Sequence, residues 1–197
     1  VAKKFNILRE EQQEFAISSH NKAHEAQKNG KLSEEIIPIG ECKEDGNIRP
    51  NSTQEKLDQL KLAFDTKGTV TAATSSPLTD GAAATIICEE NYAKENNLNI
   101  LGRIVSTAVE GCDPDYMGLG PIGASKKALM RADLSIDKID IFELNEAFAS
   151  QSLACIKDLG IDQKKVNIDG GALALGHPLG ATGARITGKA ADLLRRE

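Results

Sequence analysis

Residues 170–183, Gly-Gly-Ala-Leu-Ala-Leu-Gly-His-Pro-Leu-Gly-Ala-Thr-Gly, place His177 among five glycines. Glycine tolerates positive φ and lets the backbone approach a ligand closely, at an entropic cost in folding. His177 is one of only three histidines in the chain, and Pro178 follows it directly. A titratable imidazole held in such a bend is suited to general acid–base catalysis. The stretch therefore indicates an active-site loop, entered from a predicted strand over residues 166–169.

Strand-like and helix-like segments alternate from residue 79 onward. Strands are predicted over residues 82–88, 101–109, 139–144 and 166–169, and helices over residues 89–96, 121–132, 146–159 and 183–196. This alternation is typical of an α/β protein in which helices cover a sheet. We therefore predict a layered α/β/α domain over residues 79–197.

Residues 1–78 are more polar and richer in loops. The pattern of residues 9–28 predicts an amphipathic helix that stops at Asn29-Gly30. Thr53 is a candidate N-cap for a short helix through residue 60, and residues 69–72 resemble a strand. We interpret this region as a loop-rich α+β excursion that precedes the α/β domain.

Composition narrows the classes of function. The chain has 197 residues, is 40% hydrophobic and carries a formal net charge of −5, which argues against a nucleic-acid partner. Its sequence has no apolar run near the roughly twenty residues of a membrane span. The four cysteines are far apart and have no metal-type spacing. We therefore expect a cytoplasmic protein (organelle matrix if eukaryotic) with no nucleic-acid, membrane or metal partner.

Two weaker patterns have simpler explanations. Residues 118–123 form a literal GxGxxG with Asp140 downstream, but a dinucleotide-binding fingerprint needs a strand directly before the first glycine. Residues 112–116 precede it and have the composition of a turn. His20 and His24 are four residues apart, a spacing that can hold zinc, but no third ligand has a matching spacing. We interpret both histidines as exposed residues of a charged helix face.

Asn145 follows the predicted strand over residues 139–144 and precedes a predicted helix. Taken alone it is a good N-cap, and His177 taken alone fits a hydrogen-bonded loop residue. Together they lie where two strands of one α/β sheet end, which is where ligands bind in such folds. An amide and an imidazole that converge there can hold a water or an oxyanion.

These residues also carry a family resemblance. The Asn-Glu-Ala-Phe-Ala box of residues 145–149 and the Gly-Gly-Ala-Leu-Ala-Leu-Gly-His-Pro box of residues 170–178 resemble the two central signatures of the thiolases. The resemblance spans essentially the whole chain and includes residues 68–72, 80–83 and 117–121. Residues 75–80 look more like the degradative 3-ketoacyl-CoA thiolases than the biosynthetic acetoacetyl-CoA type.

The resemblance implies a reversible thioester Claisen reaction, in which a 3-ketoacyl-CoA and CoA give acetyl-CoA and a shortened acyl-CoA. CoA and acyl-CoA thioesters are then substrates, and no separate cofactor is needed. His177 matches the histidine that activates a cysteine nucleophile and helps to form an oxyanion hole. Asn145 matches the asparagine that holds a water in that hole. The family also implies a homo-oligomer.

Six further residues match positions that line the path of CoA in the family. They are Ser76 at the pantetheine amide, Arg49 near the adenine and phosphates, Phe64 and Ala72 along the nucleotide and pantetheine path, and Met117 and Phe148 at the acyl end. Residues 1–78 accordingly resemble the loop domain that covers CoA.

The chain departs from the family at its cysteines. Neither the Cys-x-Ser box of the nucleophile nor the Cys-x-Gly-Gly-Gly box of the proton shuttle is present around Cys42, Cys88, Cys112 or Cys155. The sequence starts at Val1 and stops inside a predicted helix. We therefore expect an inactive fragment of a longer thiolase whose C-terminal sheet is incomplete. A natural truncated protein that binds CoA or pairs with another subunit is the alternative.

Overall fold

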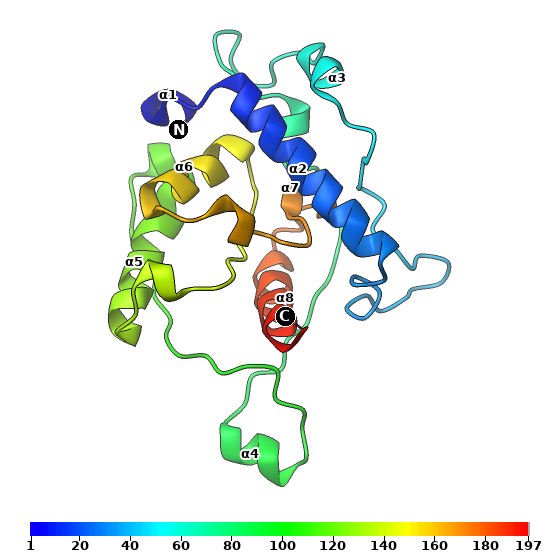
Figure 1. Cartoon of the computed structure of the whole chain (residues 1–197), viewed down its shortest axis with the longest axis vertical. Coiled ribbons are helices and arrows are strands. Elements are labelled where there is room, and N and C mark those ends of the chain that lie inside the picture. Colours follow the sequence, from blue (N-terminus) through cyan, green and yellow to red (C-terminus); the bar gives the residue numbers. More distant parts are fainter. Residues whose placement is uncertain (197) are drawn as a thin grey trace.

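The computed structural model describes residues 1–196, and a single long helix organises the fold. Helix α2 (Arg9–Lys28) crosses the molecule and contacts α6 (Ala149–Leu159) and α7 (Ala172–Leu175) (Figure 1). Helix α6 also contacts α1 (Ala2–Phe5) and α5 (Gly120–Ala132). The glycine-rich stretch therefore lies in the centre of the molecule, where α7 meets α2.

The boundaries of α2 agree with the sequence prediction and have local causes. At its start, the Leu8 amide donates to the Glu11 carboxylate at 2.6 Å, which satisfies one of the free amides of the first turn. At its end, Asn29 is the C-cap and Gly30 follows with a φ of 75°. Positive φ after a helix is a conformation that glycine adopts without strain.

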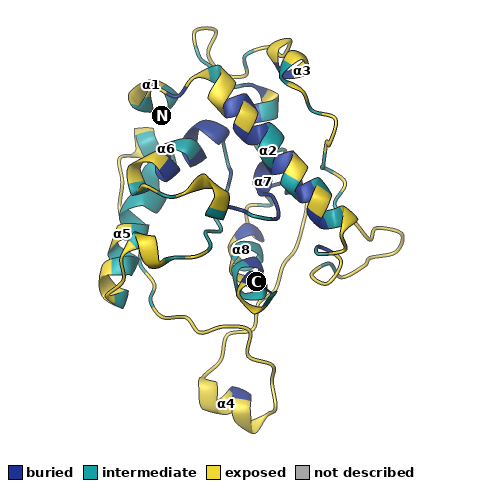
Figure 2. Cartoon of the chain, in the orientation of Figure 1, coloured by how far each residue is buried: buried dark blue, intermediate teal, exposed yellow. Residues whose placement is uncertain are grey.

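The core is built along the length of α2, in two clusters. One apolar cluster joins Phe15 and Ala16 of α2 to Ile156 of α6 and Leu173 of α7. A second cluster joins the C-terminal half of α2 to Leu32 and Leu175. Buried residues accordingly gather along α2, α6 and α7, whereas α4 (Glu90–Glu95) is almost entirely exposed (Figure 2).

The other predicted helices are present. Helix α3 (Gln54–Asp58) is capped by Thr53, whose hydroxyl accepts from the Lys56 amide at 3.4 Å. Helix α4 (Glu90–Glu95), α5 (Gly120–Ala132) with proline in its first turn, and α8 (Thr182–Arg196) also agree with their predicted ranges. In the part of the chain that the structure describes, four 3₁₀ turns connect these elements, at Ala72–Thr74, Pro114–Leu119, Ile136–Lys138 and Gln163–Lys165.

Helix α6 begins at Ala149 rather than at residue 146. Its N-cap Phe148 has extended backbone (φ −143°, ψ 142°), and the Glu146 side chain is fully buried. Glu146 is therefore committed to a tertiary contact described below rather than to a helical surface. Tertiary packing overrides local helix propensity here.

The predicted sheet is not formed within residues 1–196, where only isolated bridges occur. These bridges pair Ile39 with Cys42, Leu62 with Thr71, Ser75 with Phe148, and Phe142 with Val166. The Phe142–Val166 bridge is parallel and joins the two predicted strands that precede Asn145 and the glycine bend. Among the described residues, no other bridge joins two of the predicted strands. The described residues are mostly helical, so the layered α/β/α arrangement is present only in part, through this parallel pairing.

The segments at 82–88 and 101–109 have no named strand, and their apolar side chains are exposed. Ile86 and Val109 are each 86% exposed. Helices hold these segments instead: the Thr85 hydroxyl donates to the Ala184 carbonyl at 3.0 Å, and the Ser106 hydroxyl donates to the Ala128 carbonyl at 2.7 Å. Strand propensity reflects fit to a paired, half-buried surface, so apolar content alone does not form a strand.

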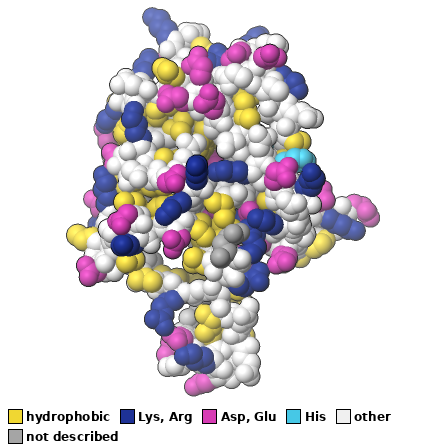
Figure 3. Space-filling view, in the orientation of Figure 1, with side chains coloured by type: hydrophobic (Ala, Val, Ile, Leu, Met, Phe, Trp, Pro, Cys, Tyr) yellow, Lys and Arg dark blue, Asp and Glu magenta, His cyan; other side chains and the backbone are white. Residues whose placement is uncertain are grey.

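The surface mixes charges of both signs. Lysine and arginine side chains are interspersed with aspartate and glutamate on the face shown in Figure 3. Among the described residues, no helix is both long enough and apolar enough to cross a membrane.

Candidate functional site

The structure brings the two predicted catalytic residues together. The Asn145 Nδ2 atom lies 3.3 Å from the His177 Nε2 atom. Asn145 stands in the segment between the Phe142–Val166 bridge and α6, and His177 stands between α7 and α8. Gly176, with a φ of 96°, turns the chain out of α7 and presents the imidazole.

The His177 ring is held from its other side as well. Its Nδ1 atom lies 2.7 Å from the Thr182 hydroxyl oxygen, and the His177 backbone amide donates to the Thr79 hydroxyl at 3.3 Å. Burial, with a smaller contribution from the positive charge of Arg185, lowers the pKa of His177. A lowered pKa keeps the ring neutral near pH 7, which is the state a general base needs.

The loop over residues 75–81 closes against this bend. Ser75 forms an antiparallel bridge with Phe148, and the Ser76 amide and hydroxyl both donate to the Ala147 carbonyl, at 3.0 Å and 3.1 Å. A Cβ on Gly176 would collide with the Thr79 side chain. Ser76 therefore lies next to the backbone of residues 145–148.

Two more of the predicted CoA-lining residues join this group. The Phe64 and Phe148 rings make an edge-to-face contact with centroids 6.0 Å apart, although Phe64 is 76% exposed. Ala72 is exposed on the 3₁₀ turn that leads to Ser76, and the Ser75 amide donates to its carbonyl at 3.4 Å. The exposed Phe64 and Ala72 thus lie beside Phe148 and the loop that carries Ser76.

Arg49 and Met117 are not joined to that group. Among residues 1–196, neither makes a hydrogen bond or ring contact with another predicted site residue. The Met117 carbonyl accepts from the Cys112 thiol at 3.9 Å, and its side chain is 77% exposed. Met117 lies in a 3₁₀ turn before α5, so the GxGxxG pattern does not follow a strand.

His20 is buried rather than exposed, which corrects the sequence interpretation. Its Nδ1 atom accepts a hydrogen bond from the Arg49 amide at 3.1 Å. Burial, followed by the charge of Arg49, lowers the pKa of His20. A helix histidine thereby anchors the loop that carries a predicted nucleotide-binding arginine, and no residue pattern around His20 signals that contact.

Acidification should release the Arg49 loop. The folded-state pKa of His20 is below its ordinary value, so its contribution to stability is complete above that ordinary value of about 6.5 and is lost as the pH falls through the lowered pKa. Protonation puts a hydrogen on Nδ1 and removes the acceptor for the Arg49 amide. We expect the Arg49 amide to gain hydrogen-exchange rate below pH 6 in NMR spectra, beyond the change of intrinsic rate. In a His20→Gln variant this extra pH dependence should vanish, and its persistence would contradict the assignment.

A buried carboxylate ties the site to α2. The Glu146 carboxylate accepts from the Ser19 hydroxyl at 2.6 Å, the Asn167 amide group at 2.8 Å and the Leu173 backbone amide at 3.1 Å. Burial is the largest cause of a raised pKa at Glu146, opposed by these hydrogen bonds. Glu146 stands inside the Asn-Glu-Ala-Phe-Ala box, but nothing local in the sequence distinguishes this buried role from that of an exposed helix glutamate.

The Glu146 hydrogen bonds also fix the neighbours of both candidate catalytic residues. The Asn167 side chain continues to the Leu144 backbone, accepting from its amide and donating to its carbonyl at 2.8 Å each. The Ser19 hydroxyl oxygen accepts from the Gly171 amide at 3.0 Å. Asn145 therefore lies between two anchored residues, and the glycine bend is fastened to α2 before it reaches His177.

An ion-pair cluster supports the start of the glycine bend. Lys189 of α8 is buried and lies 2.7 Å from the Asp169 carboxylate, and it also pairs with Glu35. Arg196 lies 2.6 Å from the same Asp169 oxygen. Although burial acts in the opposite direction, the partners Lys189 and Arg196 together lower the pKa of Asp169.

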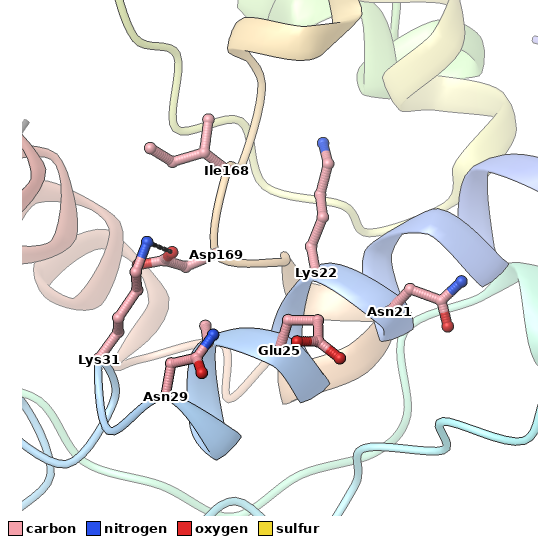
Figure 4. A pocket seen from close by; sticks show the side chains of 8 residues that line it. Asn21, Lys22, Glu25, Asn29, Lys31, Ile168 and Asp169 are labelled. Atoms are coloured by element: carbon pink, nitrogen blue, oxygen red, sulfur yellow. Dashed lines mark ion pairs between the residues drawn. The ribbon is translucent and has the colours of Figure 1, made fainter.

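An open depression lies beside this cluster, and His177 does not line it. It is lined by the C-terminal half of α2 and by residues 168–169, with Lys22 pointing over it and Lys31 3.9 Å from the Asp169 carboxylate (Figure 4). None of the predicted site residues lines it. Within residues 1–196, no group of three or more histidine, cysteine, aspartate or glutamate residues is placed to hold a metal ion.

Comparisons with known families identify both halves of the sequence. Residues 1–91 match the family model described as thiolase, N-terminal domain, and residues 98–197 match the one described as thiolase, C-terminal domain. The 3-ketoacyl-CoA thiolase of Marinobacter nauticus is 52% identical, with 95% of this chain and 51% of that protein covered. The 3-ketoacyl-CoA thiolase of Idiomarina loihiensis is 49% identical, with 100% and 54% covered. The chain thus spans about half the length of these relatives.

Solved structures share the backbone arrangement. Human mitochondrial 3-ketoacyl-CoA thiolase in complex with CoA is 43% identical, with a TM-score of 0.96 over 99% of this chain and 50% of that chain. The Bacillus anthracis acetyl-CoA acetyltransferase is also 43% identical, with a TM-score of 0.94 over 99% of this chain and 52% of that chain. These two structures therefore resemble this chain in sequence as well as in backbone fold.

Proposed function

The chain belongs to the thiolase family, and from that premise we propose that it carries the imidazole-and-amide half of an active site for 3-ketoacyl-CoA thioesters. The observation that carries the proposal is the 3.3 Å approach of Asn145 Nδ2 to His177 Nε2 beside the loop of Ser76. In the reaction proposed, a 3-ketoacyl-CoA and CoA exchange to acetyl-CoA and a shortened acyl-CoA.

The chemistry needs a base and a preorganised donor, and both are available here. His177, kept neutral by burial, can take the proton of a thiol and so produce the nucleophilic thiolate. The negative oxygen that develops on the thioester carbonyl is stabilised by fixed donors. Asn145 can supply such a donor indirectly, by holding a water that donates to the oxygen. Its Oδ1 atom, which would accept from that water, is buried and has no hydrogen-bond partner among residues 1–196.

We place CoA along the loop that carries Ser76. Its hydroxyl and amide both converge on the Ala147 carbonyl, two residues beyond Asn145, so a pantetheine chain lying there leads directly to the imidazole. The edge-to-face pair of Phe64 and Phe148 supplies apolar surface on the same side. Arg49 is proposed for the nucleotide end and Met117 for the acyl end.

Calorimetric titration with CoA tests this placement. A Ser76→Trp substitution fills the proposed pantetheine path and should weaken CoA binding about tenfold or more, equivalent to at least ~1.4 kcal/mol. Ser135→Trp, at an exposed position before a 3₁₀ turn, is the matched control and should bind like the unmodified chain. Equal affinities for the Ser76 and Ser135 variants would remove the proposed pantetheine site.

Thiolysis by the chain alone is expected to be undetectable. No cysteine thiol is hydrogen-bonded to His177 within residues 1–196, where its partners are Asn145, Thr182 and Thr79. The assay is acetoacetyl-CoA cleavage by the purified polypeptide, with its intact mass verified. Turnover that disappears in a His177→Ala variant would overturn the expectation of inactivity and identify another nucleophile in this chain.

A further inference from the structure

We propose that Thr182 is a positioning residue that holds His177 in its neutral Nδ1–H tautomer and leaves the Nε2 lone pair facing Asn145. The catalytic use of that lone pair rests on the function proposed above, but the tautomer itself rests on the hydrogen bonds of this chain. Once the Asn145 amide gives way, a thiol presented to the site would meet a ring nitrogen that is able to accept its proton.

The hydroxyl of Thr182 has a single hydrogen to donate. Thr182 is buried, and its Oγ1 atom lies 2.7 Å from His177 Nδ1 and 3.0 Å from the Pro178 carbonyl oxygen. The hydroxyl donates to the Pro178 carbonyl oxygen, which can only accept and which also accepts from the Ala181 and Thr182 amides at 2.9 Å each. Donation to a carbonyl four residues earlier is a usual arrangement for threonine in a helix. The remaining lone pairs of Oγ1 then accept from His177 Nδ1–H.

The contact on the other side of the ring favours the same tautomer. The Asn145 Nδ2 group only donates, so at 3.3 Å it requires His177 Nε2 to be an acceptor. A neutral imidazole carries one hydrogen, which must then lie on Nδ1. The two partners therefore agree. The opposite tautomer needs both the Asn145 amide and the Thr182 hydroxyl to be turned.

Proton uptake leaves the threonine side unchanged. When Nε2 is protonated, Nδ1–H still donates to Thr182, so the ring does not have to move. The new Nε2–H then needs an acceptor, and the Asn145 Oδ1 atom can supply one only if the amide rotates and gives up the water proposed above. Thr182 itself is fixed because its own amide donates to the Pro178 carbonyl at 2.9 Å, at the start of α8.

Imidazole ¹⁵N spectroscopy of the histidine-labelled chain tests the proposal. The pattern of two-bond ¹H–¹⁵N correlations distinguishes Nδ1–H from Nε2–H, and a His177→Gln variant assigns the signals. We expect Nδ1–H for His177 at a pH above its pKa. His20 is an internal reference for the opposite state, since its Nδ1 atom accepts from the Arg49 amide and its hydrogen must lie on Nε2.

Two substitutions separate positioning from simple packing. Thr182→Val keeps the shape but removes the hydroxyl, and should convert His177 from the pure Nδ1–H pattern to a mixture of tautomers. Thr182→Ser restores the hydroxyl and should restore the pattern. The His20 signals should be the same in all variants and report that the fold is retained. Nε2–H in the unmodified chain, or an unchanged pattern in Thr182→Val, would overturn the proposal.

The readout requires neither CoA nor turnover. A wrong tautomer with Ser76-dependent CoA binding would refute the role of Thr182 alone. If His177 has the Nδ1–H tautomer but the chain does not bind CoA, the result counts against the proposed function. The role of Thr182 in selecting the His177 tautomer would then still stand.

Discussion

Replacing Glu146 by alanine should lower the free energy of unfolding by roughly 3–5 kcal/mol, because several buried donors lose their acceptor at once. The carboxylate accepts from the Ser19 hydroxyl, the Asn167 side chain and the Leu173 amide at 2.6–3.1 Å. All of these groups are buried and cannot turn to solvent. Urea unfolding followed by far-UV circular dichroism measures the loss.

Matched variants separate the hydrogen bonds from the bulk of the side chain. Glu146→Gln keeps the volume and one acceptor oxygen, so it should be destabilised less than Glu146→Ala. Glu14→Ala, on the exposed face of α2, should change the free energy of unfolding by less than about 0.5 kcal/mol. If Glu146→Ala were as mild as Glu14→Ala, Glu146 would not be the link between α2 and the glycine bend.

Gly171 provides a second measure of the same contact. A Cβ at Gly171 would collide with all three atoms of the Glu146 carboxyl group. Gly171→Ala should therefore be severely destabilising in the unmodified chain and much milder in a Glu146→Ala background. The double-mutant cycle reports this coupling directly, and additive effects would contradict the packing described.

Replacing Lys189 by methionine should cost about 3 kcal/mol of unfolding free energy. The Lys189 ammonium lies 2.7 Å from the Asp169 carboxylate, and both side chains are nearly inaccessible to solvent. Methionine preserves much of the volume but leaves the buried carboxylate with one cation fewer. Arg196, 2.6 Å away, still compensates part of its charge, which keeps the expected loss at the lower end for a broken buried pair.

Lys126→Met is the control for this prediction. Lys126 lies 2.6 Å from the Asp158 carboxylate, but the Lys126 side chain is 58% exposed. An exposed pair contributes about 0–1 kcal/mol, so its loss should be small. Chemical denaturation of the two variants side by side measures the difference, and equal losses would show that burial of the Lys189 pair has no energetic consequence.

Helices were predictable from the sequence because their signals are local. The predicted range of residues 9–28 is that of α2, and the Thr53 cap and the proline of α5 are also where the sequence places them. Strands depend on partners that are distant in the chain. Residues 82–88 and 101–109 have the right composition, yet within residues 1–196 they form no ladder.

The residues of the candidate site likewise differ in whether the sequence alone predicts them. Asn145 and His177 were found from their boxes, and the structure places them in contact. His20 was assigned wrongly to an exposed face because the loop that covers it begins more than twenty residues later. The division of the chain at residue 79, the CoA contacts, the homo-oligomer and the cytoplasmic location stay predictions.

The family, the helices and the pair of residues at the centre of the proposed site follow from the amino-acid sequence alone. Short-range patterns suffice for these, since caps, glycines and signature boxes act within a few residues. Only the tertiary structure decided that Glu146 turns inward, that His20 holds the Arg49 loop and that Thr182 faces the His177 ring. Each of these contacts is a hydrogen bond whose partner is chosen by the packing of α2, α7 and α8. The glycine-rich stretch of residues 170–183 therefore identifies the imidazole, while the fold around it decides which nitrogen carries the proton.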